Sequence, residues 1–121
     1  MLERATATHD WRTRRWDAFT LVTPNFQCRL PGFAYDGDEP DGFMTRDQVS
    51  AWLARYRASF DPPVHEGVAV LRLRRADDGF ALHTSAGDLV ARQVVIATGG
   101  YHVPSIPAFG VALPPSITQL H

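Results

Sequence analysis

The sequence has no lysine, only one cysteine and no long apolar run. Its charge balance, its single cysteine and its short apolar runs each argue against a class of protein. All 12 basic residues are arginine and 13 residues are acidic, so a net charge of -1 provides no general attraction to nucleic acid or to an anionic membrane. Cys28 has no partner for an internal disulfide and cannot form a cysteine-based metal cluster. The apolar runs are far shorter than the roughly 20 residues of a membrane helix, and the first residues lack a secretory apolar region. We therefore expect the 121 residues to form one cytoplasmic domain that binds neither nucleic acid nor a membrane.

The stretch from Val94 to His102, Val-Val-Ile-Ala-Thr-Gly-Gly-Tyr-His, is the most informative part of the chain. Its apolar first half predicts a strand over 93–98 that is covered on both faces, as in a parallel sheet. Gly99 and Gly100 follow, and a residue without a Cβ permits positive φ and a close approach to another surface. Because ligands bind at the carboxyl ends of parallel strands, this turn is a candidate ligand contact. An ordinary glycine turn after a core strand is the alternative.

The most regular pattern predicts a helix of about four turns that begins after Thr45. Thr45 and Gln48 match a capping box, in which the hydroxyl accepts from the Gln48 amide and the Gln48 side chain reaches back to the cap. Asp61-Pro62-Pro63 is predicted to end the helix. The apolar face of the helix is predicted to join the core rather than a cofactor site, and comprises Val49, Trp52, Leu53, Tyr56 and Phe60.

The segments on either side of this helix have different patterns. Residues 8–44 mix aromatic side chains with prolines and glycines without a clear period, which predicts an ordered loop or a set of short turns. A loop of that length is uncommon unless it forms a cofactor or substrate wall, or packs on neighbouring structure that is missing. After the helix, alternation and glycine turns predict strands near 67–75, 79–84, 88–91 and 93–98. Together these elements indicate an α/β fold, part of a doubly wound sheet with a small antiparallel excursion.

Several other groups of residues resemble known kinds of site. The acidic turn at 36–42 fails the spacing of a calcium loop, because Pro40 stands where a ligand belongs and Asp41 takes the glycine position. The five histidines lie too far apart for a helical zinc pair, so no metal site is predicted. Cys28 is interpreted as an inert thiol, although a histidine could lie beside it in space. The arginines within 12–15, flanked by two tryptophans, fall short of a nucleic-acid-binding face and could serve a phosphate pair equally well.

A series of short motifs stands in a fixed order along nearly the whole chain: Leu2-Glu3-Arg4, Trp11, Arg15-Trp16-Asp17, Leu21, Thr23-Pro24, Leu30-Pro31-Gly32, Phe60-Asp61, Ala97-Thr98-Gly99, Pro104, Ile106 and Pro107. Their order and spacing resemble those of flavin-containing monooxygenases. Related groups are Baeyer-Villiger monooxygenases, plant auxin-forming flavin monooxygenases and bacterial FAD-dependent NAD(P)H oxidoreductases. The resemblance implies an incomplete FAD/NAD(P)-binding Rossmann-like domain.

The resemblance assigns the adenosine end of FAD to the first residues and to the strand after the helix. Glu3, with Arg4 beside it, would end the second strand of the domain and hold the ribose hydroxyls, since a carboxylate can accept two O–H bonds. Main-chain groups of Val70 would meet the adenine edge.

The resemblance assigns the rest of the cofactor to two further segments. Trp11, Arg12 and Thr23 would line the pyrophosphate and the flavin, where guanidinium and hydroxyl donors suit phosphate oxygens. Thr98 and Gly99 would pass close to the cofactor and would face the same dinucleotide as the first segment. No side chain is a convincing catalytic acid, base or nucleophile.

The family's glycine-rich FAD fingerprint lies about twenty residues before the acidic strand end, near which this sequence begins. A second fingerprint, for NAD(P)H, would follow residue 121. We therefore expect residues 1–121 to be the middle of an FAD-binding domain, lacking that fingerprint and the following NAD(P)-binding domain. The complete protein would be an FAD-dependent, NAD(P)H-linked oxidoreductase or monooxygenase of a small molecule, and the chain alone would be inactive. The alternatives are a truncated gene product and a small non-catalytic binding module that completes its sheet with a partner.

Overall fold

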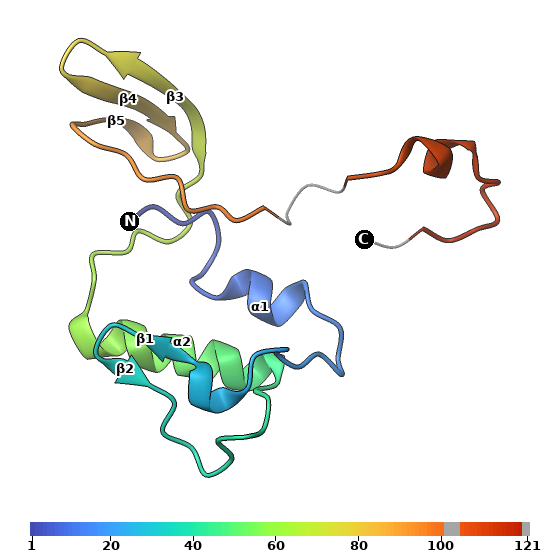
Figure 1. Ribbon diagram of the computed structural model, residues 1–121. Coiled ribbons are helices and arrows are strands. Elements are labelled where there is room, and N and C mark those ends of the chain that lie inside the picture. Colours follow the sequence, from blue (N-terminus) through green and yellow to red (C-terminus); the bar gives the residue numbers. More distant parts are fainter. Residues whose placement is uncertain (101–104, 120–121) are drawn as a thin grey trace.

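The computed structural model describes residues 1–100 and 105–119, so Tyr101, His102, Pro104 and His121 lie outside the described residues. The elements, in chain order, are α1 (His9–Thr13), the 3-10 helix η1 (Asn25–Gln27), β1 (Arg29–Leu30), β2 (Phe33–Ala34), α2 (Arg46–Phe60), β3 (Val70–Ala76), β4 (Gly79–Thr84), β5 (Gly87–Ala91) and the 3-10 helix η2 (Ala108–Ala112). Figure 1 shows α1, α2 and the β1–β2 hairpin together, with the β3–β5 sheet apart from them. None of the helices in the described ranges has the length and apolar character that crossing a bilayer requires.

Helix α2 begins and ends as the sequence predicts. The Thr45 hydroxyl accepts from the Gln48 amide at 3.3 Å, and the Gln48 side-chain oxygen accepts from the Thr45 amide at 2.8 Å, which completes the capping box. At the other end Asp61 adopts a left-handed conformation with φ 41°, and two prolines follow. Both predictions for this helix are confirmed.

The core lies between α2 and the segment before it. Met44, Val49 and Trp52 are its buried hydrophobic residues, and the partly buried side chains around them are Trp11, Leu21, Cys28, Leu30, Phe33, Tyr35 and Leu53. The predicted core face of α2 is confirmed at Val49 and Trp52. It is wrong at Phe60, whose ring centroid lies 4.9 Å from that of Tyr56 in a tilted arrangement but whose side chain is 55% exposed in the last turn of the helix.

The segment 8–44 is a set of short turns and elements, as predicted. It is fastened to the start of α2 by backbone bonds: the Leu21 amide donates to the Met44 carbonyl at 2.9 Å, and Thr20 and Thr45 form an isolated antiparallel bridge. These bonds place the aromatic residues of the segment over Val49 and Trp52, so the segment is ordered by packing rather than by regular secondary structure.

The predicted antiparallel excursion is confirmed as a three-stranded meander, β3–β4–β5. Its first strand begins at Val70, later than predicted, and the register shifts between Val70 and Arg72. Gly79 adopts φ 150°, and a Cβ there would stand 2.4 Å from the Ala91 carbonyl oxygen, so the turn between β3 and β4 requires glycine.

The strand predicted over 93–98 is wrong. Among the described residues nothing pairs with this segment, and Val95 and Ile96 are 89% and 72% exposed. A strand covered on both faces needs neighbours on both sides, and the described residues contain only one parallel pairing, the bridge of Leu2 with His65. The chain exposes 9739 Å² in total. A compact monomer of 13.4 kDa would expose about 6500 Å².

Candidate functional site

A groove of about 1180 Å³ runs along α2 on the side that faces the N-terminal segment. It is lined by Met1, Glu3, Thr6, Ala7, Thr8, Arg12, Asp47, Ser50, Ala51, Leu53, Ala54, Tyr56, Arg57, Ala58, Phe60, Asp61, Pro62, Val64 and Glu66. The N-terminal segment and α1 contribute mainly hydroxyl and charged groups, whereas α2 contributes small and apolar side chains together with Asp47, Ser50 and Arg57. The volume exceeds the roughly 300–1,000 Å³ of common ligand pockets, so a dinucleotide has room in it.

Backbone pairing with the segment after α2 fixes Glu3 in this groove. The Glu3 amide donates to the His65 carbonyl at 3.0 Å, and the Glu3 carbonyl accepts from the Val68 amide at 2.9 Å. One carboxylate oxygen of Glu3 accepts from the Ala5 amide at 3.0 Å, which orients the half-buried side chain. Because Val68 lies two residues before Val70, the pairing also brings the start of β3 close to Glu3.

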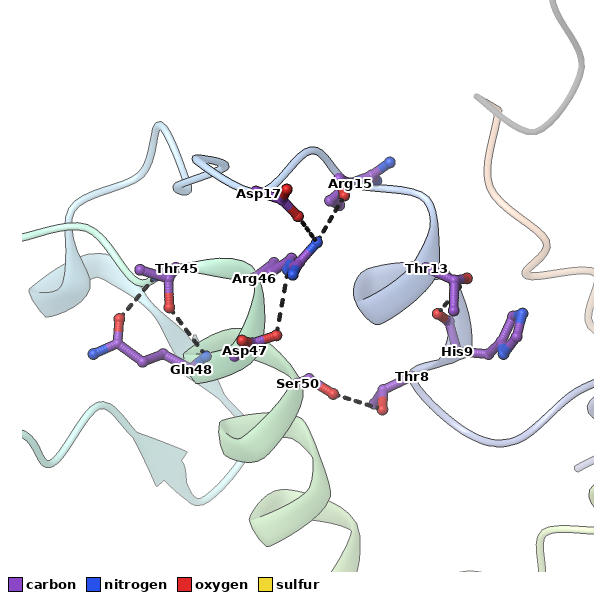
Figure 2. Close-up of polar contacts among 10 residues, drawn as sticks. All are labelled: Thr8, His9, Thr13, Arg15, Asp17, Thr45, Arg46, Asp47, Gln48 and Ser50. Carbon is purple, nitrogen blue, oxygen red and sulfur yellow. Dashed lines mark hydrogen bonds and ion pairs between the residues drawn. The ribbon is translucent and has the colours of Figure 1, made fainter.

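Helix α1 carries Arg12 and is held by polar contacts. It has five residues, too few to be stable alone, and none of them is fully buried, although Trp11 packs on the core. Thr8, its cap residue, adopts φ 65°, which is unusual for a β-branched residue. The Thr8 hydroxyl forms a 2.9 Å hydrogen bond with the hydroxyl of buried Ser50 on α2 (Figure 2). The Arg12 guanidinium makes one long bond, 3.5 Å, to the Thr6 hydroxyl and is otherwise exposed to the groove.

Two acidic side chains of the groove form ion pairs with neighbouring arginines. The Ala7 amide and then the Arg57 guanidinium hold the pKa of Glu66 below its ordinary value. Asp47 lies 3.4 Å from the Arg46 guanidinium. Asp61 also lines the groove, so the charged side chains that remain are Glu3 and Asp61 as acceptors and Arg12 as the donor to which an anion could bind.

The residues to which the resemblance gave cofactor roles are spread over the structure. Glu3 and Arg12 line the groove, and Trp11 packs on the core with the Arg15 guanidinium 5.0 Å from its ring. Val70 begins β3 and is 46% exposed. Trp11 and Val70 lie outside the groove lining, and so do four exposed residues: Arg4, Thr23, Thr98 and Gly99.

The Thr98-Gly99 turn has the backbone that the sequence predicts but no described contact with Glu3. Gly99 adopts φ 74°, in the left-handed region that favours glycine. No hydrogen bond among the described residues joins this turn to Glu3. Their common approach to one dinucleotide therefore stays a prediction.

The sequence reasoning missed the part that α2 plays in the groove. Ser50, Ala51, Ala54 and Ala58 follow one another at helical spacing on the side away from Val49 and Trp52. This run of small residues is a signal in the sequence that another segment or a ligand approaches the helix closely.

Comparison with known proteins identifies the family. Residues 8–117 match the family described as pyridine nucleotide-disulphide oxidoreductase. The chain belongs to this family. The pyridine nucleotide-disulphide oxidoreductases use FAD with NAD(P)H, so the predicted cofactors and the predicted relationship to FAD-dependent oxidoreductases are confirmed at the level of the family.

Curated relatives of this oxidoreductase chain are longer than it is. A CzcO-like uncharacterized oxidoreductase of Geobacillus kaustophilus is 38% identical over 111 residues, which cover 92% of this chain and 31% of the relative. A probable indole-3-pyruvate monooxygenase of Arabidopsis thaliana is 26% identical over 121 residues, covering 90% of this chain and 28% of the relative. The chain thus spans less than a third of the length of these relatives.

A solved structure gives the fold of the family. A flavin-containing monooxygenase from Stenotrophomonas maltophilia superposes with a TM-score of 0.63 and 22% identity, over 74% of this chain and 28% of that protein. At this identity the likeness shows the fold, and it confirms the predicted class: part of an FAD/NAD(P)-binding α/β fold with small antiparallel sheets.

The groove fits an FAD by its size and by the chemistry of its donors and acceptors. Glu3 keeps one carboxylate oxygen that is not bonded to Ala5, and Arg12 has guanidinium donors beyond its long bond to Thr6. Thr6, Thr8 and Ser50 add hydroxyls at the same end.

Proposed function

We propose that this chain forms one wall of the FAD site in an FAD-dependent, NAD(P)H-linked oxidoreductase of the flavin monooxygenase type. The observation that carries the proposal is the groove in which Glu3 and Arg12 lie together between the N-terminal segment and α2. Family membership over residues 8–117 supports the same conclusion. Bound FAD supplies the redox chemistry, and the protein supplies binding and orientation.

In this proposal Glu3 accepts hydrogen bonds from the ribose hydroxyls of the adenosine, and main-chain groups of Val70 meet the adenine edge. Arg12 donates to the pyrophosphate, where a guanidinium can form two parallel bonds. Arg4, Trp11 and Thr23 belong to the same wall. We assign no acid, base or nucleophile to the chain.

Thr98 and Gly99 approach the cofactor from the segment after β5. This part of the proposal rests on the family resemblance and on the left-handed backbone of Gly99. In the isolated chain the segment is exposed, so the approach requires neighbouring strands that cover residues 93–98.

The large exposed surface supports a further part of the proposal, that residues 1–121 act as part of an FAD-binding domain together with additional polypeptide. We also propose that the complete enzyme acts on a small-molecule substrate. We propose that it is cytoplasmic, because an enzyme that uses NAD(P)H works where that cofactor is found. The competing hypothesis is a non-catalytic module whose exposed surface is covered by a different protein.

Titration of the chain with FAD tests the proposal. We expect saturable quenching of flavin fluorescence that ADP competes away, because ADP carries the ribose and pyrophosphate that Glu3 and Arg12 would bind. The Glu3→Gln variant removes a charged acceptor and is expected to weaken binding about tenfold. Arg29→Gln, an exposed arginine outside the groove, is the control. Absence of saturable binding, or equal affinity for Glu3→Gln, would contradict the proposal.

A further inference from the structure

The start of α2 contacts the segment around α1 at two separate points, and both contacts are polar. At the first, buried Ser50 bonds to the Thr8 hydroxyl just before α1. At the second, one nitrogen of Arg46, Nη1, donates to the Arg15 carbonyl at 3.2 Å and lies 2.9 Å from the Asp17 carboxylate, just after α1. Figure 2 shows the two contacts on either side of the short helix.

Arg46 is better placed than a surface arginine to hold the turn after α1. Its side chain is only 25% exposed, and its Nε lies 3.4 Å from Asp47, a groove carboxylate. One guanidinium therefore fixes the turn after α1 and also compensates a negative charge in the groove. The Arg15 residue whose carbonyl it binds covers the Trp11 ring at 5.0 Å, so the contact extends to the residue next to Arg12.

From these contacts we propose that Arg46 and Ser50 are positioning residues, which hold α1 so that Arg12 lies in the groove with Glu3. The proposal rests on the proposed function, because the purpose of the position is to bind the FAD pyrophosphate. Helix α1 has five residues and none is fully buried, and Trp11 is the one that packs on the core, so these side-chain bonds add to weak packing in holding the helix in place. Arg46 lies outside the groove lining and need not touch the cofactor, whereas Ser50 lines the groove and holds α1 through its bond to Thr8.

The first test needs no cofactor. Hydrogen exchange of the His9–Thr13 amides is measured in the full chain and in the Arg46→Gln and Ser50→Ala variants. We expect faster exchange in α1 for both variants, with the free energy of unfolding of the whole chain changed little. Arg55→Gln is the matched control, because Arg55 lies on the same helix and pairs with Asp36 away from α1. Unchanged exchange in α1 for both variants would overturn the proposal.

The second test separates positioning from general stability. FAD affinity of the full chain is measured for Arg12→Gln, Arg46→Gln and the double variant. We expect about a tenfold loss for each single variant. In the Arg12→Gln background, Arg46→Gln is expected to add less than about a twofold loss, because its effect acts through Arg12. Additive losses, or no loss for Arg46→Gln, would overturn the proposal.

The outcomes distinguish this inference from the proposed function. If the unaltered chain does not bind FAD, the proposed function fails, and the exchange data still report whether α1 is held as described. If the unaltered chain binds FAD and the Arg46 and Ser50 variants bind equally well, only the inference fails. Should Arg46→Gln fail to fold, the FAD affinities of Ser50→Ala, Arg12→Gln and their double variant are compared in the same way, since Ser50→Ala removes a single oxygen.

Discussion

Thr8 offers a prediction in which two effects can be separated by choice of substitution. Thr8→Gly and Thr8→Ala both remove the hydroxyl that bonds to Ser50, so this loss cancels between them. At φ 65° an L-residue is disfavoured by about 1–2 kcal/mol, and alanine keeps that strain whereas glycine does not. Relative to alanine, glycine lowers the stability by about 0.4–1 kcal/mol, because it gives the unfolded chain more conformational freedom. We therefore expect Thr8→Gly to be more stable than Thr8→Ala by about 1 kcal/mol.

Urea unfolding of the two variants measures this difference, which corresponds to about 4 °C in the melting temperature. Thr13 in α1 provides the control, because glycine is disfavoured in a helix by about 1 kcal/mol relative to alanine. The order of the two variants is therefore expected to reverse at Thr13. If Thr8→Ala is as stable as Thr8→Gly, residue 8 is not left-handed in solution, and the description of how α1 is held is wrong.

Three other predictions follow from the core and from the pKa shifts. Trp52→Ala is expected to lower the free energy of unfolding by about 3–5 kcal/mol in urea titrations, since Trp52 is buried in the core; a loss under about 1 kcal/mol would contradict that placement. Burial raises the pKa of the Cys28 thiol, so iodoacetamide at neutral pH is expected to alkylate Cys28 more slowly in the folded chain than in urea, and equal rates would refute this. The pKa of Glu66 is lowered first by the Ala7 amide and then by Arg57. The stabilisation from the Glu66 carboxylate is therefore complete above the ordinary pKa of 4.5 and is lost as the pH falls through the lower pKa of the folded chain. In a pH titration by NMR, the Ala7 amide resonance is expected to shift with a midpoint below 4.5. A midpoint at or above 4.5 would contradict the contact.

Elements whose signals are local could be predicted from the sequence. Helix α2 carries its own start signal at Thr45 and its own stop signal at Asp61, and both depend only on neighbouring residues. The meander after it has glycine turns, of which Gly79 is sterically required. Glu3 was found through a family motif, and the structure places it in the groove with Arg12.

Features that depend on distant partners could not be predicted. The apolar run at 93–98 has the composition of a buried strand, but composition cannot show whether neighbouring strands are present in the chain. The contacts of Ser50 with Thr8 and of Arg46 with Asp17 join residues 42 and 29 positions apart, and a single serine or arginine gives no sign of its partner. The positive φ of Thr8 likewise had no signal, because threonine rarely adopts it.

Backbone amide NMR during FAD titration tests most directly the claim that Glu3 and Arg12 share one dinucleotide site. We expect saturable shifts for residues 3–6, for residues 8–12 and for the start of β3 near Val70, with the β4–β5 hairpin, Gly79–Ala91, unaffected. Shifts confined to that hairpin, or no saturable shifts at Glu3 and Arg12, would contradict the claim.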